Sequence, residues 1–282
     1  MGFKKKDVCV IIVSYNSDEV ILESIKRLQK LELEVVIIDN ASEEGTRQML
    51  QTKTQGAKFI WNKTNVGIGK ALNQGLSYAK EQGYSLLLTM DQDSVFKEGA
   101  VEELIAVMNM DSSIVSVGAA YTSQQLISEQ RYKKVQYLIS SGNLVNVSSA
   151  VKVGGYTEEL FIDSVDFDFS LKLLADGGKL VLALQAILEH KIGEFEETVL
   201  LGKAVRWLGH SPVRYYYMYR NHGYILKKYF MSFPGFCLKK TLFMGKDFLK
   251  LIFIEQQKKI KLKMVFKGIK DAFGGKYGGY ED

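Results

Sequence analysis

The sequence predicts an α/β protein in which a mostly parallel, doubly wound sheet is flanked by helices. Three observations predict this fold class. Short aliphatic segments alternate four times with longer amphipathic segments over roughly the first hundred residues. Loops of a few residues join these segments, as in right-handed crossovers between parallel neighbours. Apolar residues make up 46% of the 282-residue chain, which contains two prolines, so a large core can form.

The first strand and helix illustrate the pattern. Residues 8–13 (VCVIIV) are almost entirely β-branched, as is typical of a buried parallel strand. The run ends at Ser14, and Ser17 or Asp18 can cap a helix that extends to about residue 29. Further strands are expected at residues 34–38, 57–61 and 86–88. The helices that follow them are expected at residues 43–52, with Ser42 as the cap, 70–82 and 98–109.

The second half of the chain is less regular. Strands are expected at residues 114–117, 135–139, 143–147, 179–182 and 186–188, and a helix at 165–174. The polar segment 121–132 is expected to be a loop. Residues 1–200 would form one domain, and residues 201–282 a helical, basic C-terminal extension.

Four polar clusters each lie just after the carboxyl end of an expected strand. They are Ser14-Tyr15-Asn16, Asp39-Asn40, Asn65-Val66-Gly67 and Asp91-Gln92-Asp93. In one parallel sheet these clusters share an edge, where open α/β sheets bind ligands, so the sequence predicts a nucleotide site there. Gly67 and Gly69 fit neither GxGxxG nor GxxxxGK(S/T), which argues against a dinucleotide fold and a P-loop.

Asp91 and Asp93 form a DxD pair directly after a buried apolar run. Two neighbouring carboxylates repel each other, so the pair is costly without a cation or hydrogen-bond donors. Mg²⁺ or Mn²⁺, held by one or two carboxylates and by phosphate oxygens, would offset this repulsion. The alternative is a solvated acidic turn.

A second acidic cluster lies in residues 158–168, among aromatic and aliphatic residues. The helical spacing of residues 165–174 places Asp166 in a first turn, where the helix dipole favours a negative charge. Helix capping is therefore the alternative to a catalytic role for Asp163 and Asp166.

The motifs together carry a family resemblance. They are SYNS, VVIIDNAS, NVGIGKALNQG, LLLTMDQDS, VGGYTEELFIDSVDFDFSLKL and LEHKIGE, in this order. The chain resembles the family 2 inverting glycosyltransferases of the Rossmann-like GT-A fold, and within them the bacterial rhamnosyltransferase-like branch, where DQDS is typical. The resemblance covers roughly residues 7–195 and continues weakly to Asn221. Val165 stands where the general family often has Glu, which favours the rhamnosyl branch.

The resemblance implies a role for each matching position. Asp166 would be the catalytic base, Asp93 a direct metal ligand, and Asp91 a ligand of the metal or the ribose. His190 would complete the coordination of Mg²⁺ or Mn²⁺, with a structural hydrogen bond as the alternative. Contacts to the nucleotide sugar are implied for Ser14, Tyr15, Asn16, Asp39, Asn40, Asn65, Gly67, Lys70, Asn73, Asp91 and Gln92.

One base implies a single, inverting displacement, because a retaining double displacement needs a second carboxylate as nucleophile. Asp163 and Asp168 are the nearest candidates, but Asp168 lies two positions after Asp166 and should point away on a helix. General-base assistance is typically worth about 10²–10⁴ in rate. A metal would stabilise the departing diphosphate.

The basic charge is concentrated at one end of the chain. Residues 227–282 contain 13 Lys, no Arg and five acidic residues, a net charge of +8. The whole chain carries +5, so residues 1–226 carry −3. A helical wheel aligns seven apolar residues, interrupted by Glu255 and Lys259: Phe248, Leu251, Ile252, Leu262, Phe266, Ile269 and Phe273.

A basic amphipathic helix of this kind suits an anionic membrane surface. The alternative is a helix hairpin that packs on the core or forms a homodimer through the C-terminal helices. The basic residues of this segment are all lysine and occur without motifs that read bases, which argues against nucleic-acid binding. Arg214 and Arg220 lie in a Tyr-rich segment, which is expected to be a helix that packs on the catalytic domain. The alternative is that one of these arginines binds a phosphate of the acceptor. Residues 203–207 (KAVRW) resemble the QxxRW motif of processive synthases by coincidence.

The sequence shows neither a signal peptide nor an apolar run of about eighteen residues. Two separated cysteines, Cys9 and Cys237, imply no disulfide framework. We therefore expect a cytoplasmic protein, peripheral on the inner face of the cell membrane.

The expected activity is transfer of L-rhamnose from dTDP-L-rhamnose to a lipid-linked glycan acceptor in bacterial surface polysaccharide synthesis. The alternative donors are UDP-galactofuranose and a UDP-hexose. Two other classes stay open. DQDSV also fits the DxDx(T/V) motif of haloacid dehalogenase-type phosphatases, and a non-catalytic nucleotide-sugar binder would keep the same residues.

Overall fold

The computed structural model describes residues 2–121, 130–190, 195–200 and 203–280. The chain divides into two compact units. The first consists of Met1–Glu158 and Val165–Lys191, and the second of Glu159–Ser164 and Ile192–Asp282. Each unit is described separately below.

The first unit contains a mixed sheet with the strand order β3-β2-β1-β4-β8-β6-β9-β5, and β7 pairs with β9. Its strands are β1 (Val8–Ser14), β2 (Glu34–Asp39), β3 (Lys58–Trp61), β4 (Leu86–Asp91), β5 (Ser94–Phe96), β6 (Ile114–Tyr121), β7 (Tyr132–Lys134), β8 (Asn143–Asn146) and β9 (Lys179–His190). The pairs β1–β2, β2–β3, β1–β4 and β6–β9 are parallel. β8, β5 and β7 are antiparallel to their neighbours, so the sheet is parallel in its first half and mixed in its second.

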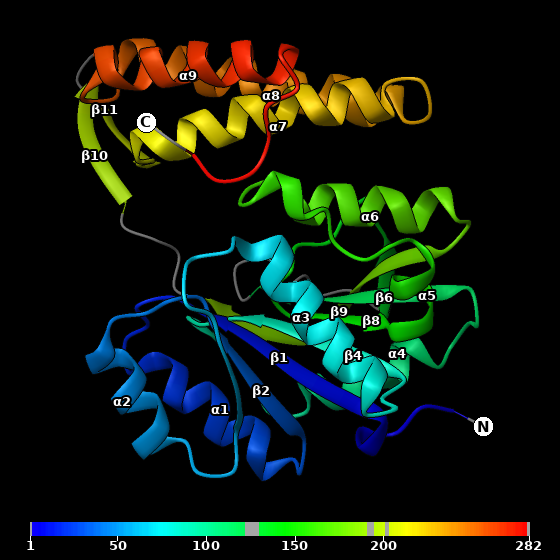
Figure 1. The fold of residues 1–282 in the computed structure, drawn as a ribbon. Helices are drawn as coiled ribbons and strands as arrows, with labels where there is room; N and C mark the ends of the chain where they lie inside the picture. Colours follow the sequence, from blue (N-terminus) through cyan, green and yellow to red (C-terminus); the bar gives the residue numbers. More distant parts are fainter. Residues whose placement is uncertain (1, 122–129, 191–194, 201–202, 281–282) are drawn as a thin grey trace. The chain divides into compact units, whose positions relative to one another are not determined.

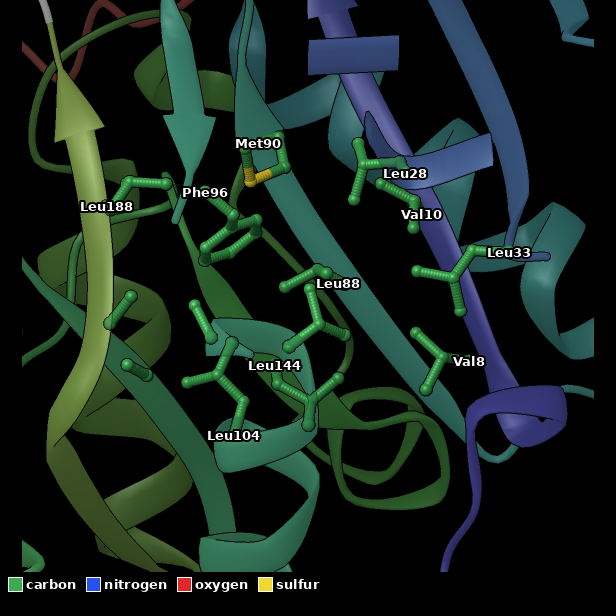
Figure 2. Close-up of a cluster of buried hydrophobic side chains, with 14 of the residues drawn as sticks. Val8, Val10, Leu28, Leu33, Leu88, Met90, Phe96, Leu104, Leu144 and Leu188 are labelled. Carbon is green, nitrogen blue, oxygen red and sulfur yellow. The ribbon is translucent and has the colours of Figure 1, made fainter. Parts of the chain in front are cut away.

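Helices cover both faces of this sheet (Figure 1). They are α1 (Val20–Lys30), α2 (Glu44–Lys53), α3 (Ile68–Glu81), α4 (Ala100–Met108), α5 (Val147–Lys152) and α6 (Val165–Ala175), with short 3-10 turns η1 (Lys5–Asp7) and η3 (Glu158–Leu160). Alternate residues of β1 point to opposite faces, as the strand period requires. Val8 and Val10 belong to one buried hydrophobic cluster that also contains Leu28 of α1 and Leu104 of α4 (Figure 2).

Most expected strands and helices are present, and the differences have local causes. The expected strand at 135–139 is wrong: β7 ends at Lys134, just before this segment, and the Leu138 amide donates to the Ser170 hydroxyl. The two strands expected at 179–182 and 186–188 form one strand, β9, with a register shift against β6. Ser42 does not cap α2, because its hydroxyl accepts the Asn16 amide. Most of the expected loop at 121–132 lies outside the described residues.

The second unit contains an antiparallel hairpin and three helices. The hairpin is β10 (Phe195–Leu200) with β11 (Lys203–Leu208), and the helices are α7 (Pro212–Tyr229), α8 (Pro234–Phe253) and α9 (Lys258–Phe273). The helices of the extension were expected, whereas the hairpin, which contains the KAVRW segment, was not. α7 and α9 approach closely at Gly268, where a Cβ would lie 2.5 Å from the Tyr216 carbonyl oxygen. Among the described residues, no helix is long and apolar enough to cross a membrane.

Arg220 and Asn221 of α7 bind the backbone of the 159–164 segment. Asn221 Nδ2 lies 2.8–2.9 Å from the carbonyl oxygens of Leu160, Ile162 and Asp163. Arg220 donates to the Leu160 carbonyl and is fully buried. Burial therefore contradicts the alternative role of Arg220 as an acceptor-phosphate ligand. Arg214, in contrast, is exposed and lies 3.8 Å from Asp163.

Candidate active site

Three neighbouring strands end in polar residues at one edge of the sheet. Ser14 of β1 is paired with Asp39 of β2, and Val13 of β1 is paired with Asp91 of β4. The Ser14 and Ser17 hydroxyls lie 3.0 Å apart and close the turn after β1. The register therefore brings together the polar ends of β1, β2 and β4, as the alternation of strands and helices predicts.

The turn after β1 is hydrogen-bonded to the DxD turn. The Tyr15 amide donates to Gln92 Oε1 at 2.7 Å, and Gln92 Nε2 donates to the Tyr15 carbonyl at 3.2 Å. Asn16 has a positive φ of 47° and is held by the Ser42 hydroxyl and the Glu43 amide. Gln92 and Asn16 thus shape the loops, while the Tyr15 ring is about half exposed and can pack against a flat ligand.

Asp39 is fully buried, and its two carboxylate oxygens differ. Oδ2 accepts hydrogen bonds from the Ser42 amide and from Arg47 Nε, each at 3.0 Å. Oδ1 is buried with no hydrogen-bond partner among the described residues. A buried acceptor without a donor is costly, so this oxygen suits the N–H of a ligand.

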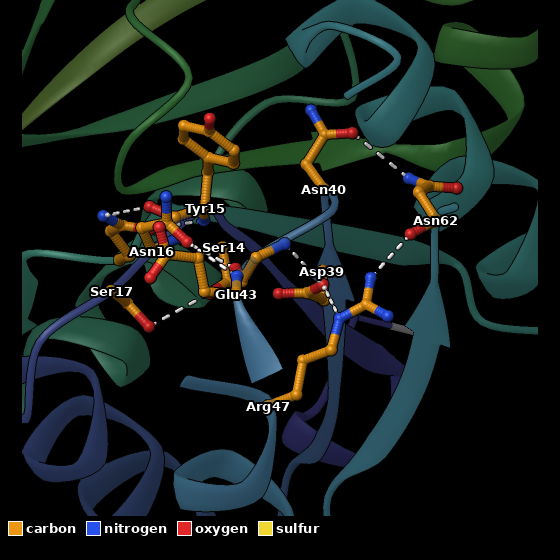
Figure 3. Close-up of polar contacts among 11 residues, drawn as sticks. Ser14, Tyr15, Asn16, Ser17, Asp39, Asn40, Glu43, Arg47 and Asn62 are labelled. Atoms are coloured by element: carbon orange, nitrogen blue, oxygen red, sulfur yellow. Dashed lines mark hydrogen bonds and ion pairs between the residues drawn. The ribbon is translucent and has the colours of Figure 1, made fainter. Parts of the chain in front are cut away.

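Arg47 is a site residue that the motif set does not include. It reaches from α2 to Asp39 and donates from Nη2 to the Asn62 carbonyl at 2.7 Å (Figure 3). Its guanidinium carbon also lies 5.3 Å from the centroid of the Trp61 ring. The sequence signal is weak, since Arg47 is only an arginine about one turn into the helix that follows the Asp39 strand.

Asn40 and Asn65 bind each other and the glycine-bearing loop. Asn40 Nδ2 donates to Asn65 Oδ1 at 2.9 Å, and Asn40 Oδ1 accepts the Val66 amide. Asn62 Nδ2 also donates to Asn40 Oδ1, and the Gly67 amide donates to Asn65 Oδ1. Gly67 has a φ of 82°, which favours glycine. Asn40 is buried and its amide is committed to this network.

Lys70 and Asn73, the expected nucleotide-sugar contacts on α3, have different surroundings. Lys70 is exposed. The Asn73 amide clamps the segment before α6: Oδ1 accepts the Tyr156 amide, and Nδ2 donates to the Tyr156 carbonyl and to Glu158 Oε1. The described contacts of Asn73 are therefore made within the protein.

Three carboxylates influence the pKa of Tyr121. This residue ends β6, and its ring packs against the hydrophobic core. Burial raises the pKa of Tyr121, and the negative charges of Asp91, Asp166 and Asp93 raise this pKa further. Since such effects decay with distance, the DxD turn and the first turn of α6 lie in the same region as the end of β6. The motif set does not include Tyr121, because it lies on a strand between two of the matched segments.

Asp166 and Asp168, both in the first turn of α6, have different environments. Asp166 is partly exposed, and its Oδ1 accepts the Phe167 amide at 2.9 Å. Asp168 is fully buried, accepts the Thr157 hydroxyl, and lies 3.2 Å from the Lys172 ammonium. Asp168 is therefore held in the protein interior, as its position two residues after Asp166 predicts.

The donor groups fit a divalent cation that binds together with a phosphate ligand. Within the described ranges, no group of three or more His, Cys, Asp or Glu residues could hold a metal. Mg²⁺ characteristically uses one or two carboxylates and takes its other ligands from water and phosphates. The DxD carboxylates match that requirement. The His190 side chain lies outside what the structure describes, but its backbone pairs with Ser94, the residue after Asp93.

Comparisons with known proteins agree with this geometry. The dTDP-rhamnosyl transferase RfbF of Shigella flexneri is 28% identical over 249 residues, covering 79% of this chain and 80% of the relative. The mannosyltransferase PcManGT from Pyrobaculum calidifontis, solved with GDP-Man and Mn²⁺, matches with a TM-score of 0.60 at 14% identity. That match covers 99% of this chain and 77% of that one.

A second solved structure is that of GalNAc-T7 with UDP, GalNAc and Mn²⁺. It matches with a TM-score of 0.59 at 17% identity, covering 95% of this chain, which spans 56% of the GalNAc-T7 chain. At these identities the structural likeness concerns the fold, which is GT-A. The model of glycosyl transferase family 2 matches residues 9–155, more than half of the chain. The chain therefore belongs to glycosyl transferase family 2.

Proposed function

We propose that this glycosyltransferase moves a sugar from a nucleoside-diphosphate donor to an acceptor hydroxyl in a single, inverting displacement. Two observations carry the proposal: Asp91 ends β4 beside the polar ends of β1 and β2, and the negative charges of Asp91, Asp93 and Asp166 all raise the pKa of Tyr121. The displacement requires a carboxylate pair that can bind a cation beside the diphosphate and a separate carboxylate that can accept a proton. The DxD turn and Asp166 provide both.

Asp166 is the proposed general base. The acceptor hydroxyl loses its proton to a carboxylate oxygen of Asp166 while the acceptor oxygen forms a bond to the anomeric carbon. The bond between that carbon and the diphosphate oxygen breaks, and its electron pair leaves with the nucleoside diphosphate. Asp168 is bound to Thr157 and Lys172 and is not a candidate nucleophile, which supports inversion.

Asp93 is the proposed direct metal ligand, with Asp91 or His190 as the second. Mg²⁺ or Mn²⁺, when bound, would neutralise charge that develops on the departing diphosphate. The pairing of His190 with Ser94 supports this assignment at the level of the backbone. Exposed Lys70 is a proposed second cation for the diphosphate.

Asp39 and Tyr15 are proposed to bind the nucleotide base. Because Arg47 and the Ser42 amide occupy Oδ2, Oδ1 of Asp39 can accept a hydrogen bond from the base. Uracil and thymine carry such an N–H at position 3, whereas cytosine has a bare nitrogen there. The half-exposed Tyr15 ring can stack on the base.

The proposed donor is dTDP-L-rhamnose, which the similarity to RfbF supports. UDP-galactofuranose and a UDP-hexose remain the alternative donors, since Asp39 suits both pyrimidines. The proposed acceptor is a lipid-linked glycan of a bacterial surface polysaccharide, met at the inner face of the cell membrane. The family assignment excludes a haloacid dehalogenase-type phosphatase.

The test is a screen of nucleotide sugars with the purified full-length chain, followed by release of free nucleotide with Mn²⁺, with Mg²⁺ and with EDTA. We expect turnover with dTDP-L-rhamnose that EDTA abolishes and Mn²⁺ or Mg²⁺ restores. Asp166→Asn should lose about 10²–10⁴ in kcat. Asp176→Asn, at an exposed position in the turn just after the same helix, is the matched control and should keep wild-type turnover.

Two outcomes would contradict the proposal. If Asp166→Asn turned over as fast as the wild type, Asp166 would not be the general base. Donor binding without any turnover, over a panel of lipid-linked acceptors, would indicate a non-catalytic nucleotide-sugar binder.

A further inference from the structure

The outer side of α8 carries an apolar stripe that no described side chain covers. Leu238, Leu242, Leu249 and Phe253 are spaced i, i+4, i+11 and i+15, so they share one face of the helix. Each is more than half exposed, from 54% for Leu249 to 68% for Phe253. Gly235 and Gly245 lie on the same side, and a Cβ on either would meet no atom within 4 Å. We call Leu238, Leu242, Leu249 and Phe253 the α8 outer stripe.

The α8 outer stripe differs from the stripe that the sequence predicts. Leu251 is fully buried, and Phe248, Ile252 and Leu262 pack beside it against Tyr215 of α7. These residues form the inner face of the unit. The left-handed residue Gln257 separates α8 from α9, so one helical wheel cannot describe both helices.

In residues 227–280, the described acidic side chains are buried, whereas most lysine side chains are exposed. Asp247 is paired with Lys250, Glu255 accepts from Lys261 and Tyr215, and Asp271 accepts the Tyr216 hydroxyl. The exposed lysines are Lys227, Lys228, Lys239, Lys246, Lys258, Lys259, Lys263, Lys270 and Lys276. Between residues 227 and 280, the described surface is therefore cationic and apolar, without an exposed carboxylate.

We propose that the α8 outer stripe, flanked by Lys239 and Lys246, docks on an anionic lipid bilayer. A bilayer offers both chemistries that this face requires: acyl chains for the leucines and phenylalanine, and phosphate head groups for the lysines. The α8 helix has 20 residues, about 30 Å of length, and would lie in the plane of the interface. The proposal extends the proposed lipid-linked acceptor, but it concerns binding and not transfer.

The charge distribution on this face favours a bilayer over two other partners, a second copy of the chain and a nucleic acid. A symmetric pair of two copies would bring lysines against lysines, because this face has no exposed acid to receive them. A nucleic acid would pair with the lysines but would leave the apolar stripe against a charged backbone. Both remain outcomes of the test.

The test is co-sedimentation of the full-length chain with sucrose-loaded vesicles, without any donor or acceptor. One set of vesicles is phosphatidylcholine with 30% phosphatidylglycerol, and the other is phosphatidylcholine alone. We expect binding to the anionic set that weakens with salt. The combined variant Leu238→Ser, Leu242→Ser, Leu249→Ser and Phe253→Ser should bind at least about tenfold more weakly, since each side chain would otherwise enter the interface.

Matched controls separate the face from general effects. Lys239→Gln with Lys246→Gln should weaken binding, whereas Lys26→Gln with Lys30→Gln, the same charge change on exposed positions of α1, should not. Met110→Ser with Val213→Ser removes exposed apolar side chains elsewhere and should bind as wild type. Thermal unfolding of each variant checks the fold, and nucleotide release without acceptor checks the active site independently.

Three results would overturn the proposal. The first is equal binding by the wild type and the stripe variant, or no binding to either vesicle set. The second is a wild-type dimer, seen by sedimentation velocity, that the stripe variant dissociates without any vesicle binding, which would indicate a second copy as the partner. The third is retention on RNA but not on anionic vesicles.

Discussion

Arg47 donates from Nε to Oδ2 of the fully buried Asp39 at a distance of 3.0 Å. The same guanidinium donates to the Asn62 carbonyl and lies over the Trp61 ring, so it is held from three sides. This arrangement fixes the orientation of Asp39 and leaves Oδ1 toward the proposed base site. Arg47 is thus the positioning residue of the proposed nucleotide site.

Arg47→Leu should weaken donor binding more than it slows turnover. Without the guanidinium, Asp39 loses its counter-charge and one donor, and its carboxylate can rotate. We expect KM for the donor to rise about tenfold and the protein to lose about 2 kcal/mol of unfolding free energy. Arg47→Lys should recover part of the charge effect but not the forked geometry. Steady-state kinetics and urea unfolding measure both, and an unchanged KM would contradict the role.

Tyr121→Phe tests whether the phenol acts on the neighbouring carboxylates. The phenol is protonated at neutral pH and can donate its O–H, and the negative charges of Asp91, Asp93 and Asp166 act on it. Removing this donor should raise the pKa of the proposed base, so the acidic limb of the kcat profile should move to higher pH.

The control for that profile is Tyr132→Phe, at the start of β7. A purely structural role of Tyr121 would lower the activity equally at every pH and leave the acidic limb in place. The pH dependence of kcat at saturating donor distinguishes the two outcomes.

Glu255→Gln should strongly destabilise the second unit. Burial alone would raise the pKa of Glu255, but the hydrogen bonds from Lys261, Tyr215 and Lys250 together lower it, so the group is ionised at neutral pH. The variant leaves the buried Lys261 without its counter-charge. We expect a loss of about 3 kcal/mol in urea unfolding. Exposed Glu159→Gln is the control, and a loss below about 1 kcal/mol would contradict the prediction.

His222 should make stability fall in mild acid. Burial, and then the positive charge of Lys240, lower its pKa from 6.5 to about 4. The unfolded chain therefore binds a proton that the folded chain does not. The contribution is present above pH 6.5 and is lost as the pH falls toward 4. Between pH 7.5 and 5.0 this amounts to about 2 kcal/mol.

Urea unfolding of the wild type and of His222→Gln at both pH values measures this slope. The variant should have the shallower dependence, whatever its absolute stability. A residual slope is expected from His210, whose pKa burial also lowers. Parallel slopes for the two proteins would show that His222 does not contribute.

The regular elements of the first unit could be predicted because their signals are local. The β-branched run at 8–13 forms a buried strand, and the residues just after it lie at the sheet edge. β9 could not be predicted as one strand, since Gln185 interrupts its apolar pattern and pairing with β6, β5 and β7 alone extends it.

The candidate site was predictable only in part, for a related reason. Strand ends of a parallel sheet meet at one edge, so Ser14, Asp39 and Asp91 could be placed together from their spacing. Arg47 and Tyr121 could not, because they reach the site through packing against Trp61 and the core. Asn73 matches the motif, yet its amide binds Tyr156, which follows it by more than eighty residues.

By itself the sequence determined the family motifs, the polar ends of the strands and the excess of lysine near the C-terminus, since all three are patterns of neighbouring residues. Tertiary structure alone decided which side of each C-terminal helix is exposed. Leu251 and Glu255 lie inside, whereas Leu238 and Phe253 lie outside. The pattern of apolar residues along a helix does not by itself fix which side is buried. Contacts with α7, whose residues are distant in sequence, determine which side is shielded from solvent.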